Sequence, residues 1–465
     1  MIIQGGMGVA ISDWRLAQAV ARRGQLGVIS GTGIDTVLVR RLQDGDPGAD
    51  MRRAIAQFPL PQIAEDVLRR YFLPEGRQPG TPYKLIPMYR HGGTRPSEPL
   101  TILAAFVEVY LAKEGHSGPV GMNLLTKVQH PNLALLYGAM LAGVDAILMG
   151  AGIPRDVPAA LDAMAAHRPA LLAFDVEGLA SGESEHLTLD PSAYWEGPPP
   201  PLTRPLFLPI IASNSLATMM ARKASGRVDG FIIEGPTAGG HNAPPRGEMQ
   251  LNAQGEPIYG PRDEVDLAKI RQLGLPFWLA GGAGSPERLK QALDAGAAGV
   301  QVGTLFAYCE ESGLAEPLRR AVLSEAVEGK VRVRTDPRAS PTGYPFKVVE
   351  WSGEGAAAKR SRVCDLGYLR TAYRTADGQI GFRCASEPID TYVAKGGAVE
   401  ETEGRECLCN ALMANVGIGQ VRADDQLEPP LLTSGDDLRL IGTFLAGQTH
   451  YSAAEVIDYL LAGIR

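Results

Sequence analysis

Eight short apolar segments, each followed by a stretch with helical spacing, constrain the fold of this chain most strongly. They comprise residues 2–5, 26–30, 120–124, 146–150, 209–213, 229–234, 277–281 and 299–302. Alternating strands and helices form parallel sheets, and eight such units close into a barrel. The sequence therefore predicts an α/β protein of the (β/α)8 TIM-barrel class.

The helices that follow these strands are also recognisable. They are expected at residues 13–23, 132–142, 157–166, 215–224 and 265–273. A further helix begins after Ser285, a good N-cap, places Pro286 at its first position and ends before Gly296. A ninth strand-like run, residues 170–176, is expected outside the barrel as an extra edge piece.

Three regions depart from a minimal barrel. One insertion spans about residues 44–99 around a helix at 63–71, and a second, irregular and rich in proline, spans 178–205. After about residue 327 the strand–helix rhythm stops. We therefore expect a barrel over residues 1–327 and a smaller, mostly helical C-terminal extension or lid over 328–465, with helices at 436–446 and 453–461.

The turns after the last two predicted strands carry runs of small residues. Gly281 and Gly282 follow one strand, and Gly303 and Thr304 follow the next. Glycine lets backbone N–H groups approach an oxyanion, and the helix N-terminus that follows favours negative charge. Two such turns late in a barrel predict a phosphate-bearing ligand. The alternative is a pair of ordinary tight turns that bind nothing.

Three other strand ends offer groups that suit such a ligand. After Gly239 and Gly240, His241 would lie over the barrel mouth; the alternative is a loop histidine bonded to backbone. Asn123 can donate and accept hydrogen bonds, as the edge of a heterocycle requires; the alternative is an asparagine that only forms a turn. Gly5, Gly6 and Met7 end the first strand, and their backbone is free to face the ring of a bound ligand.

In this order, several segments resemble the nitronate monooxygenase family, historically called 2-nitropropane dioxygenases. They are Ile3-Gln4-Gly5-Gly6-Met7-Gly8-Val9, residues 121–124, Ala238-Gly239-Gly240-His241, Ala280-Gly281-Gly282 and Gly299-Val300-Gln301-Val302-Gly303-Thr304. The resemblance covers roughly residues 1–325, and the family includes flavin-dependent enoyl reductases built on the same FMN barrel.

The resemblance implies that FMN binds at the barrel mouth, with His241 near its reactive face. It places the phosphate on Gly282 and on the run Gln301, Val302, Gly303 and Thr304. It places Gly239, Gly240 and Gly281 in the cofactor site, and brings Asn123, Gly5, Gly6 and Met7 to the ring. Family members usually follow the histidine with Arg-Gly, whereas here Asn242-Ala243-Pro244-Pro245 intervene. The resemblance therefore supports the assignment of the cofactor better than that of the substrate.

The leading functional hypothesis is an FMN-dependent oxidoreductase that oxidises a nitronate-like substrate with O2. His241 would then remove the α-proton of a nitro compound or bind its oxygens. The alternative is an NAD(P)H-dependent flavin enoyl(-acyl carrier protein) reductase. A barrel isomerase or lyase without flavin, and an idle barrel whose extension binds a partner, stay open.

Composition limits the partners. The net charge of −7 disfavours nucleic acid or an anionic membrane as the main partner, so a small-molecule substrate is expected. No signal peptide or membrane span is evident, which predicts a cytoplasmic protein; a homo-oligomer is compatible with the sequence.

Four cysteines lie within the predicted extension: Cys364, Cys384, Cys407 and Cys409. Such a group can bind zinc or an iron–sulfur cluster. Their spacing matches no common motif, so ordinary buried thiols are the default and the metal is unknown. Cys309, after the eighth strand, is expected in the core.

Overall fold

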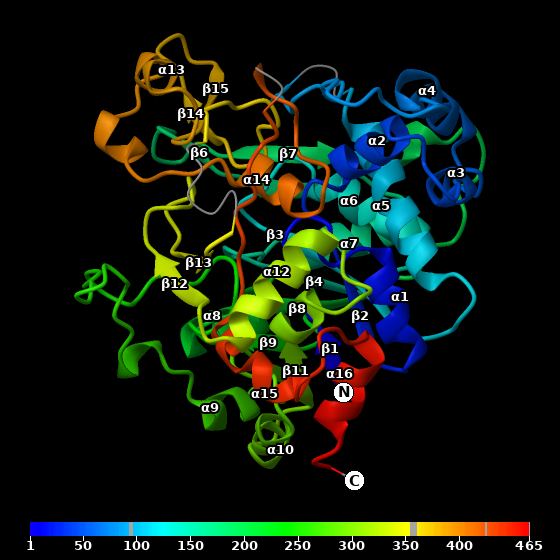
Figure 1. The fold of residues 1–465 in the computed structure, drawn as a ribbon. Coiled ribbons are helices and arrows are strands. Elements are labelled where there is room, and N and C mark those ends of the chain that lie inside the picture. Colours follow the sequence, from blue (N-terminus) through cyan, green and yellow to red (C-terminus); the bar gives the residue numbers. More distant parts are fainter. Residues whose placement is uncertain (93–95, 354–359, 424–425, 465) are drawn as a thin grey trace.

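The structure of the protein is a computed structural model that describes residues 1–92, 96–353, 360–423 and 426–464. Eight parallel strands close into a barrel, in the order β1-β11-β10-β9-β8-β4-β3-β2 (Figure 1). The strands are β1 (Ile2–Gln4), β2 (Leu26–Ser30), β3 (Val120–Leu125), β4 (Ala146–Gly150), β8 (Leu206–Ile211), β9 (Phe231–Glu234), β10 (Phe277–Ala280) and β11 (Gly299–Val302). The predicted (β/α)8 barrel is confirmed.

The barrel closes where the first strand pairs with the last. Gln4 of β1 lies in register with Val302 of β11, and the amide of Gly5 donates to the Val302 carbonyl at 2.9 Å. Apolar side chains fill the interior, as expected of a packed barrel rather than a pore. They include Ile3, Val28, Leu148, Leu208, Ile232, Trp278 and Ala280.

Helices surround the barrel and cover its outer face. They are α1 (Trp14–Arg22), α6 (Asn132–Leu141), α7 (Val157–Ala165), α8 (Asn214–Lys223), α9 (Leu267–Arg271), α10 (Pro286–Asp294), α11 (Thr304–Ala307) and α12 (Glu316–Val327). Ser285 caps α10 by accepting from the amide of Arg288, with Pro286 in the first helical position, as predicted.

The first insertion is more helical than predicted. It contributes α3 (Asp50–Ile55) and α4 (Pro61–Tyr71) between two helices the sequence did not reveal, α2 (Ile34–Gln43) and α5 (Glu98–Lys113). Residues 93–95 of the predicted insertion lie outside the described residues. Helix α5 is buried on nearly all sides, so it lacks the amphipathic stripe that marks a surface helix.

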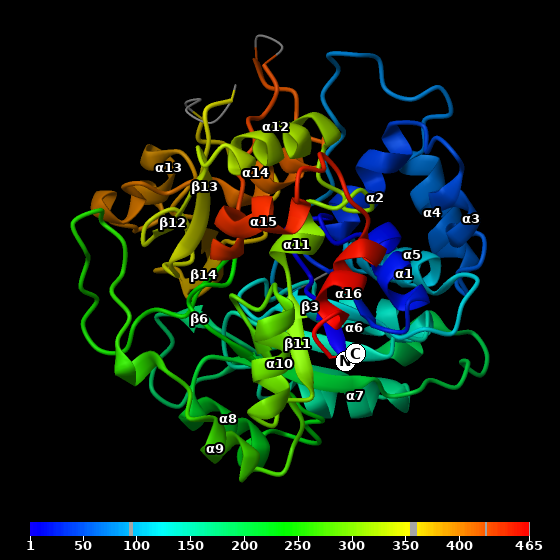
Figure 2. The ribbon, with the colours of Figure 1, turned by 60° about the horizontal axis from the view of Figure 1, so that its bottom comes forward.

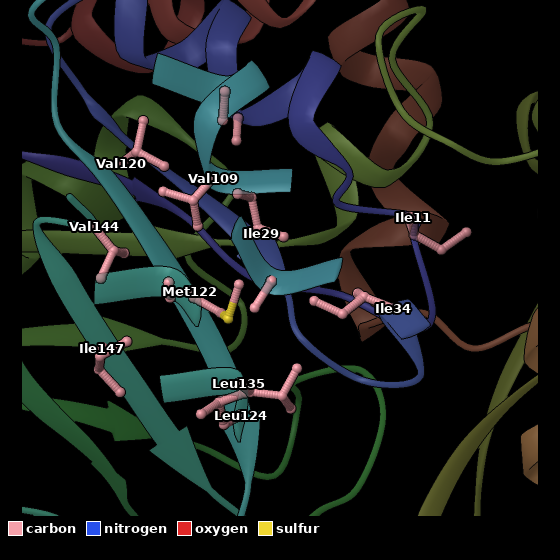
Figure 3. Packing of buried hydrophobic residues seen from close by; sticks show 14 of the residues in the cluster. Ile11, Ile29, Ile34, Val109, Val120, Met122, Leu124, Leu135, Val144 and Ile147 are labelled. Atoms are coloured by element: carbon pink, nitrogen blue, oxygen red, sulfur yellow. The ribbon is translucent and has the colours of Figure 1, made fainter. Parts of the chain in front are cut away.

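Helix α5 packs between α1, α2 and α6 and extends the apolar core outward from the barrel. Figure 3 shows side chains of α5, α6 and three barrel strands gathered in this layer. They include Val109, Leu135, Ile29, Met122 and Ile147.

Two predictions from the sequence need correction: the bounds of the fifth barrel strand and the irregularity of the second insertion. The fifth barrel strand was predicted at 209–213 but spans Leu206–Ile211, because Ser213 instead caps α8 by accepting from the amide of Leu216. The second insertion is less irregular than predicted. It contains β7 (Glu185–Leu189) and the 3-10 helix η1 (Pro191–Tyr194), and β7 pairs antiparallel with β5 (Ala170–Phe174). The pair lies outside the barrel, as predicted for the ninth strand.

The C-terminal extension contains short strands besides the predicted helices. The strands are β12 (Arg332–Asp336), β13 (Phe346–Glu350), β14 (Thr371–Arg374) and β15 (Ile380–Arg383). The helices are α13 (Ile389–Ala394), η3 (Val399–Thr402), α14 (Leu408–Asn415), η5 (Asp436–Leu440), α15 (Ile441–Leu445) and α16 (Ala453–Leu461). Residues 354–359, 424–425 and 465 of the extension lie outside the described residues.

The extension is joined to the barrel at several places. Strand β14 pairs in parallel with β6 (Val176–Glu177), which directly precedes the second insertion. The Tyr368 hydroxyl donates to the buried carboxylate of Asp35 in α2. Helix α16 packs against α1 and α10, as Figures 1 and 2 both show.

Among the described residues, no helix combines the length and the apolar character needed to cross a membrane.

The contact between α5 and α6 gives a test of the packing. A Cβ atom on Gly138 of α6 would lie 2.1 Å from the Ile102 carbonyl oxygen of α5. We expect Gly138→Ala to force the helices apart and to lower the free energy of unfolding by roughly 1–3 kcal/mol in urea titrations. Gly197→Ala, where no heavy atom lies within 4 Å of the new Cβ, is the control. Equal urea midpoints for the two variants would contradict this packing.

Candidate functional site

A large cavity opens at the C-terminal ends of the barrel strands, where barrel enzymes place their active sites. It encloses about 1680 Å³, including the space open to solvent. All the residues that the sequence predicted for the site line it. They are Gly5, Gly6, Met7, Asn123, Gly239, Gly240, His241, Gly281, Gly282, Gln301, Val302, Gly303 and Thr304. Their roles in cofactor binding and catalysis stay predictions.

The turn between β10 and α10 has a shape that requires glycine. Gly281 and Gly282 have φ angles of +88° and +63°. A Cβ atom on Gly281 would lie only 3.0 Å from the Thr237 hydroxyl oxygen. At the same turn, the amide of Gly284 donates to a carboxylate oxygen of Asp437 at 3.2 Å. The turn therefore already donates one amide to a carboxyl oxygen supplied by the extension, and burial raises the pKa of that carboxyl group.

The turn between β11 and α11 borders the same cavity. Helix α11 begins at Thr304, so its first amides have no acceptor within the helix. A Cβ atom on Gly303 would lie 3.3 Å from the sulfur of Met7, which shows how closely the β1 turn approaches. The two late turns and the first turn thus face one space.

His241 reaches the cavity from the loop after β9. Its Nε2 atom forms a 2.7 Å hydrogen bond with the hydroxyl of Ser340, and its ring packs edge-on against Phe346. Burial lowers the pKa of His241 to about 4. The imidazole is therefore neutral at pH 7, which makes it a weak base and a good hydrogen-bond donor.

Glu234, at the end of β9, is a site residue that the sequence analysis missed. Its side chain lines the cavity, and the described residues offer it no hydrogen bond or ion pair. Burial raises the pKa of Glu234 to about 8, so the carboxyl group carries a proton at neutral pH. An acidic residue that ends an otherwise apolar strand, directly before Gly235, is the sequence signal that could have identified it.

Among the described residues, two side-chain oxygens that barrel strands contribute to the cavity wall are buried without a partner. They are Oδ1 of Asn123 and Oε1 of Gln301. Because unpaired buried polar atoms are costly, these two atoms call for a ligand with hydrogen-bond donors. A Cβ atom on Gly6 would lie 2.4 Å from that of Asn123, so the first turn is shaped around this amide.

The extension forms one wall of the cavity, and the sequence analysis, which predicted an extension or lid, named none of its residues for the site. This wall is mostly apolar, and its residues include Phe346, Leu369, Leu408, Leu412 and Leu432. Residues 433–437 of the extension also contact the barrel loops. The amide of Gly240 donates to the Thr433 hydroxyl at 2.8 Å, and the amide of Gly435 donates to Thr304 at 3.1 Å.

The four cysteines of the extension gather around a second, much smaller cavity. Cys409 lines both cavities. Burial raises the pKa of Cys407 and of Cys409, so both are neutral thiols. Within the described ranges, no three His, Cys, Asp or Glu residues are arranged to hold a metal ion. Cys309 lies in the core, as predicted.

Segments of this chain are similar in sequence to known proteins. The family model for nitronate monooxygenase matches residues 204–341, which include the β9, β10 and β11 turns. A probable nitronate monooxygenase from Bacillus subtilis (strain 168) is 34% identical over 108 residues, 23% of this chain. The match spans 29% of that relative's length.

Two solved structures are among those similar to this chain. FabK from Thermotoga maritima has a TM-score of 0.48 and 16% identity, covering 99% of this chain and 91% of that one. Nitroalkane oxidase from Streptomyces ansochromogenes has a TM-score of 0.46 and 15% identity, covering 100% and 95%.

The site is thus a barrel mouth with paired glycine turns and a histidine. The resemblance predicted from the motifs is confirmed over residues 204–341, the segment that the nitronate monooxygenase family model matches.

The neutral state of His241 has a measurable consequence. In the unfolded chain a histidine titrates near pH 6.5, whereas the folded pKa is about 4. The folded state therefore loses stability as the pH falls from about 6.5 to 4. We expect wild type to lose up to about 3 kcal/mol more than His241→Gln between pH 7 and pH 4. Urea titrations at both pH values measure this difference.

The control for this measurement is His450→Gln, which removes an imidazole that is 72% exposed. It should follow the wild-type pH dependence. If wild type and His241→Gln lose the same free energy of unfolding, His241 is not buried in its neutral form.

Proposed function

We propose that the protein is an FMN-dependent oxidoreductase. One observation carries the proposal: the two late glycine turns and the first turn converge on one cavity that also holds His241. The cavity is lined by barrel turns on one side and by the extension on the other, so a cofactor on the barrel turns would leave the extension wall to face a substrate.

The cavity wall suits FMN at both ends. The amides of the Gly282 and Gly303 turns would hold the phosphate, as helix N-termini commonly do. The unpartnered oxygens of Asn123 and Gln301 would accept from the ring edge, and protonated Glu234 would donate to it. When bound, the flavin supplies the electron transfer, and the protein orients and tunes it.

Of the two reactions predicted for this site, the geometry favours NAD(P)H-dependent reduction of an unsaturated acyl thioester. The wall built by Leu369, Leu408 and Leu412 matches an apolar chain. A small nitronate anion would leave this wall unused, and burying its charge there without a cation is costly.

His241 would act on this substrate as a hydrogen-bond donor. Because Nε2 is engaged by Ser340, Nδ1 is left for the ligand. A neutral imidazole can bind a carbonyl oxygen and stabilise the negative charge that develops there. Its low pKa makes removal of an α-proton a poor role for it.

Nitronate oxidation with O2 is the second candidate. The segment matched by the nitronate monooxygenase family model, residues 204–341, contains His241 and both late turns. A nitro or nitronate oxygen could accept from the imidazole in the same way as a carbonyl oxygen.

The cofactor assignment is tested by colour and by one glycine. We expect the purified protein to be yellow and to release FMN on denaturation. Gly282→Ala strains a φ of +63° and brings the new Cβ within 3.3 Å of Thr237, so we expect the FMN Kd to rise at least tenfold. Fluorescence titration of the flavin-free protein measures it.

Gly255→Ala is the matched control, because Gly255 has a φ of +78° and no atom within 4 Å of a new Cβ. Its FMN Kd should equal that of wild type. A colourless protein that FMN cannot reconstitute would favour the flavin-free isomerase or lyase instead.

The two redox reactions are separated by anaerobic mixing. We expect NADPH or NADH to bleach the flavin and a 2-enoyl thioester to restore its colour. Leu412→Gln should lower kcat/KM for an eight-carbon thioester about tenfold more than for a four-carbon one, because the apolar wall is damaged. Leu427→Gln, at a residue 70% exposed, should change neither value. A flavin that NAD(P)H leaves oxidised while nitronates and O2 turn over would reverse the assignment.

A further inference from the structure

Three polar side chains in the extension side of the cavity have no role in the proposed cofactor site. They are Tyr308, just after α11, Asn415 at the end of α14, and Ser434. Their exposed fractions are 1%, 2% and 4%, so all three are more than nine-tenths buried. All three nevertheless line the large cavity. We call these residues the polar trio.

Within the described part of the chain, each member of the polar trio carries a buried oxygen that lacks a hydrogen bond of good geometry. They are the Tyr308 hydroxyl, Oδ1 of Asn415 and the Ser434 hydroxyl. The Tyr308 and Ser434 hydroxyls are close enough to interact with each other, whereas Oδ1 of Asn415 has no partner among the described residues. Few polar atoms are buried unpaired in folded proteins, so the Asn415 oxygen indicates that something else completes this site. The trio is therefore a prepared polar site rather than a packing defect.

The orientation of Asn415 is fixed by its other contacts. Its Nδ2 atom donates to the Leu431 carbonyl at 2.8 Å, and its backbone carbonyl accepts from the amide of Ala315 at 2.9 Å. The amide group is thus held with Oδ1 free. An amide oxygen can only accept, so its partner must be an N–H or O–H group.

Tyr308 and Ser434 lie next to each other. Burial raises the pKa of Tyr308, and the neighbouring Ser434 hydroxyl offsets part of that rise. Both hydroxyls are neutral, and each can donate or accept. No member of the trio is charged, so the site favours a neutral polar group over a carboxylate or a phosphate.

The surroundings of the trio are apolar. Leu314, Leu412 and Leu432 line the cavity around the trio. Leu432 directly follows Leu431, whose carbonyl group accepts from Asn415. A ligand here must place one neutral polar group within an otherwise apolar stretch. Pantetheine-linked acyl thioesters have this character, since their arm carries amide groups; a hydroxyl-bearing acyl chain has it too.

We propose that the polar trio is a substrate subsite that binds a neutral amide or hydroxyl group of a thioester substrate, with Asn415 accepting its N–H or O–H. This rests on the proposed function, because it concerns the substrate of the same cavity. The extension would then determine which thioesters the barrel accepts. Asn415 is a specificity-determining residue in this account.

The test compares Asn415→Leu with wild type on three crotonyl thioesters. The N-acetylcysteamine thioester carries an amide in its arm, the S-ethyl thioester carries none, and the S-ethyl thioester of 4-hydroxy-2-butenoate carries only a chain hydroxyl. We expect kcat/KM for the amide-bearing substrate to fall about tenfold in Asn415→Leu, and that for plain S-ethyl crotonyl to stay within twofold. A loss on the hydroxyl substrate alone would assign the subsite to the acyl chain.

Binding is measured separately from turnover. S-propyl-N-acetylcysteamine, an unreactive thioether that retains the amide, should bind wild type more tightly than Asn415→Leu by about tenfold in calorimetry. The matched control is Asn410→Leu, which removes another fully buried asparagine of α14 that does not line the cavity. It should leave the preference for the amide-bearing ligand unchanged.

Each remaining outcome overturns one part of the account. Equal losses on all three substrates, or no loss of thioether binding, would overturn the subsite. A raised FMN Kd in Asn415→Leu with unchanged thioether binding would assign the trio to the cofactor instead. A protein that binds the thioether through Asn415 but binds no FMN would overturn the proposed function and keep the subsite.

Discussion

Closure of the barrel by the pairing of β1 with β11 is the constraint on which the site depends. The hydrogen bond from Gly5 to Val302 places the first turn of the chain beside the last turn of the barrel. Residues almost three hundred positions apart then border one cavity, and Met7 packs against Gly303. Parallel pairing puts every strand's carboxyl end at the same rim, so the turns after β9, β10 and β11 join them there. Without this pairing, the turns after β1 and β11 would not be neighbours.

The extension completes what the barrel begins. Ser340 holds the ring of His241, Thr433 and Gly435 bond to barrel loops, and Asp437 bonds to the α10 turn. These contacts come from segments that follow the eighth strand by up to about 135 residues in sequence, yet they reach the late glycine turns and the histidine alike. The apolar wall and the polar trio also belong largely to this region. Under the proposed function, the barrel would hold the cofactor and the extension would shape the substrate site.

The strand ends and glycine turns could be predicted because local chemistry specifies them. Gly281 and Gly282 adopt positive φ angles that glycine favours, and Ser285 followed by Pro286 is a favourable helix start. Helix α5 could not be predicted from periodicity, because burial on nearly all faces removes the pattern. The sequence places Glu234 at the end of a strand, but the protonation state of its carboxyl group depends on a cavity that only the folded chain creates. Asn415 and Ser434 could not be predicted as site residues, because only the folded chain brings them into the cavity wall beside residues distant in sequence.

A crystal structure of the protein with FMN tests the central claim most directly. The account predicts phosphate oxygens within hydrogen-bond distance of the amides of Gly282 and of the Gly303–Thr304 turn, with the ring over the carboxyl ends of β9, β10 and β11. It also predicts that the ring edge meets the free oxygens of Asn123 and Gln301. A phosphate bound elsewhere, with both turns unoccupied by the cofactor, would contradict it.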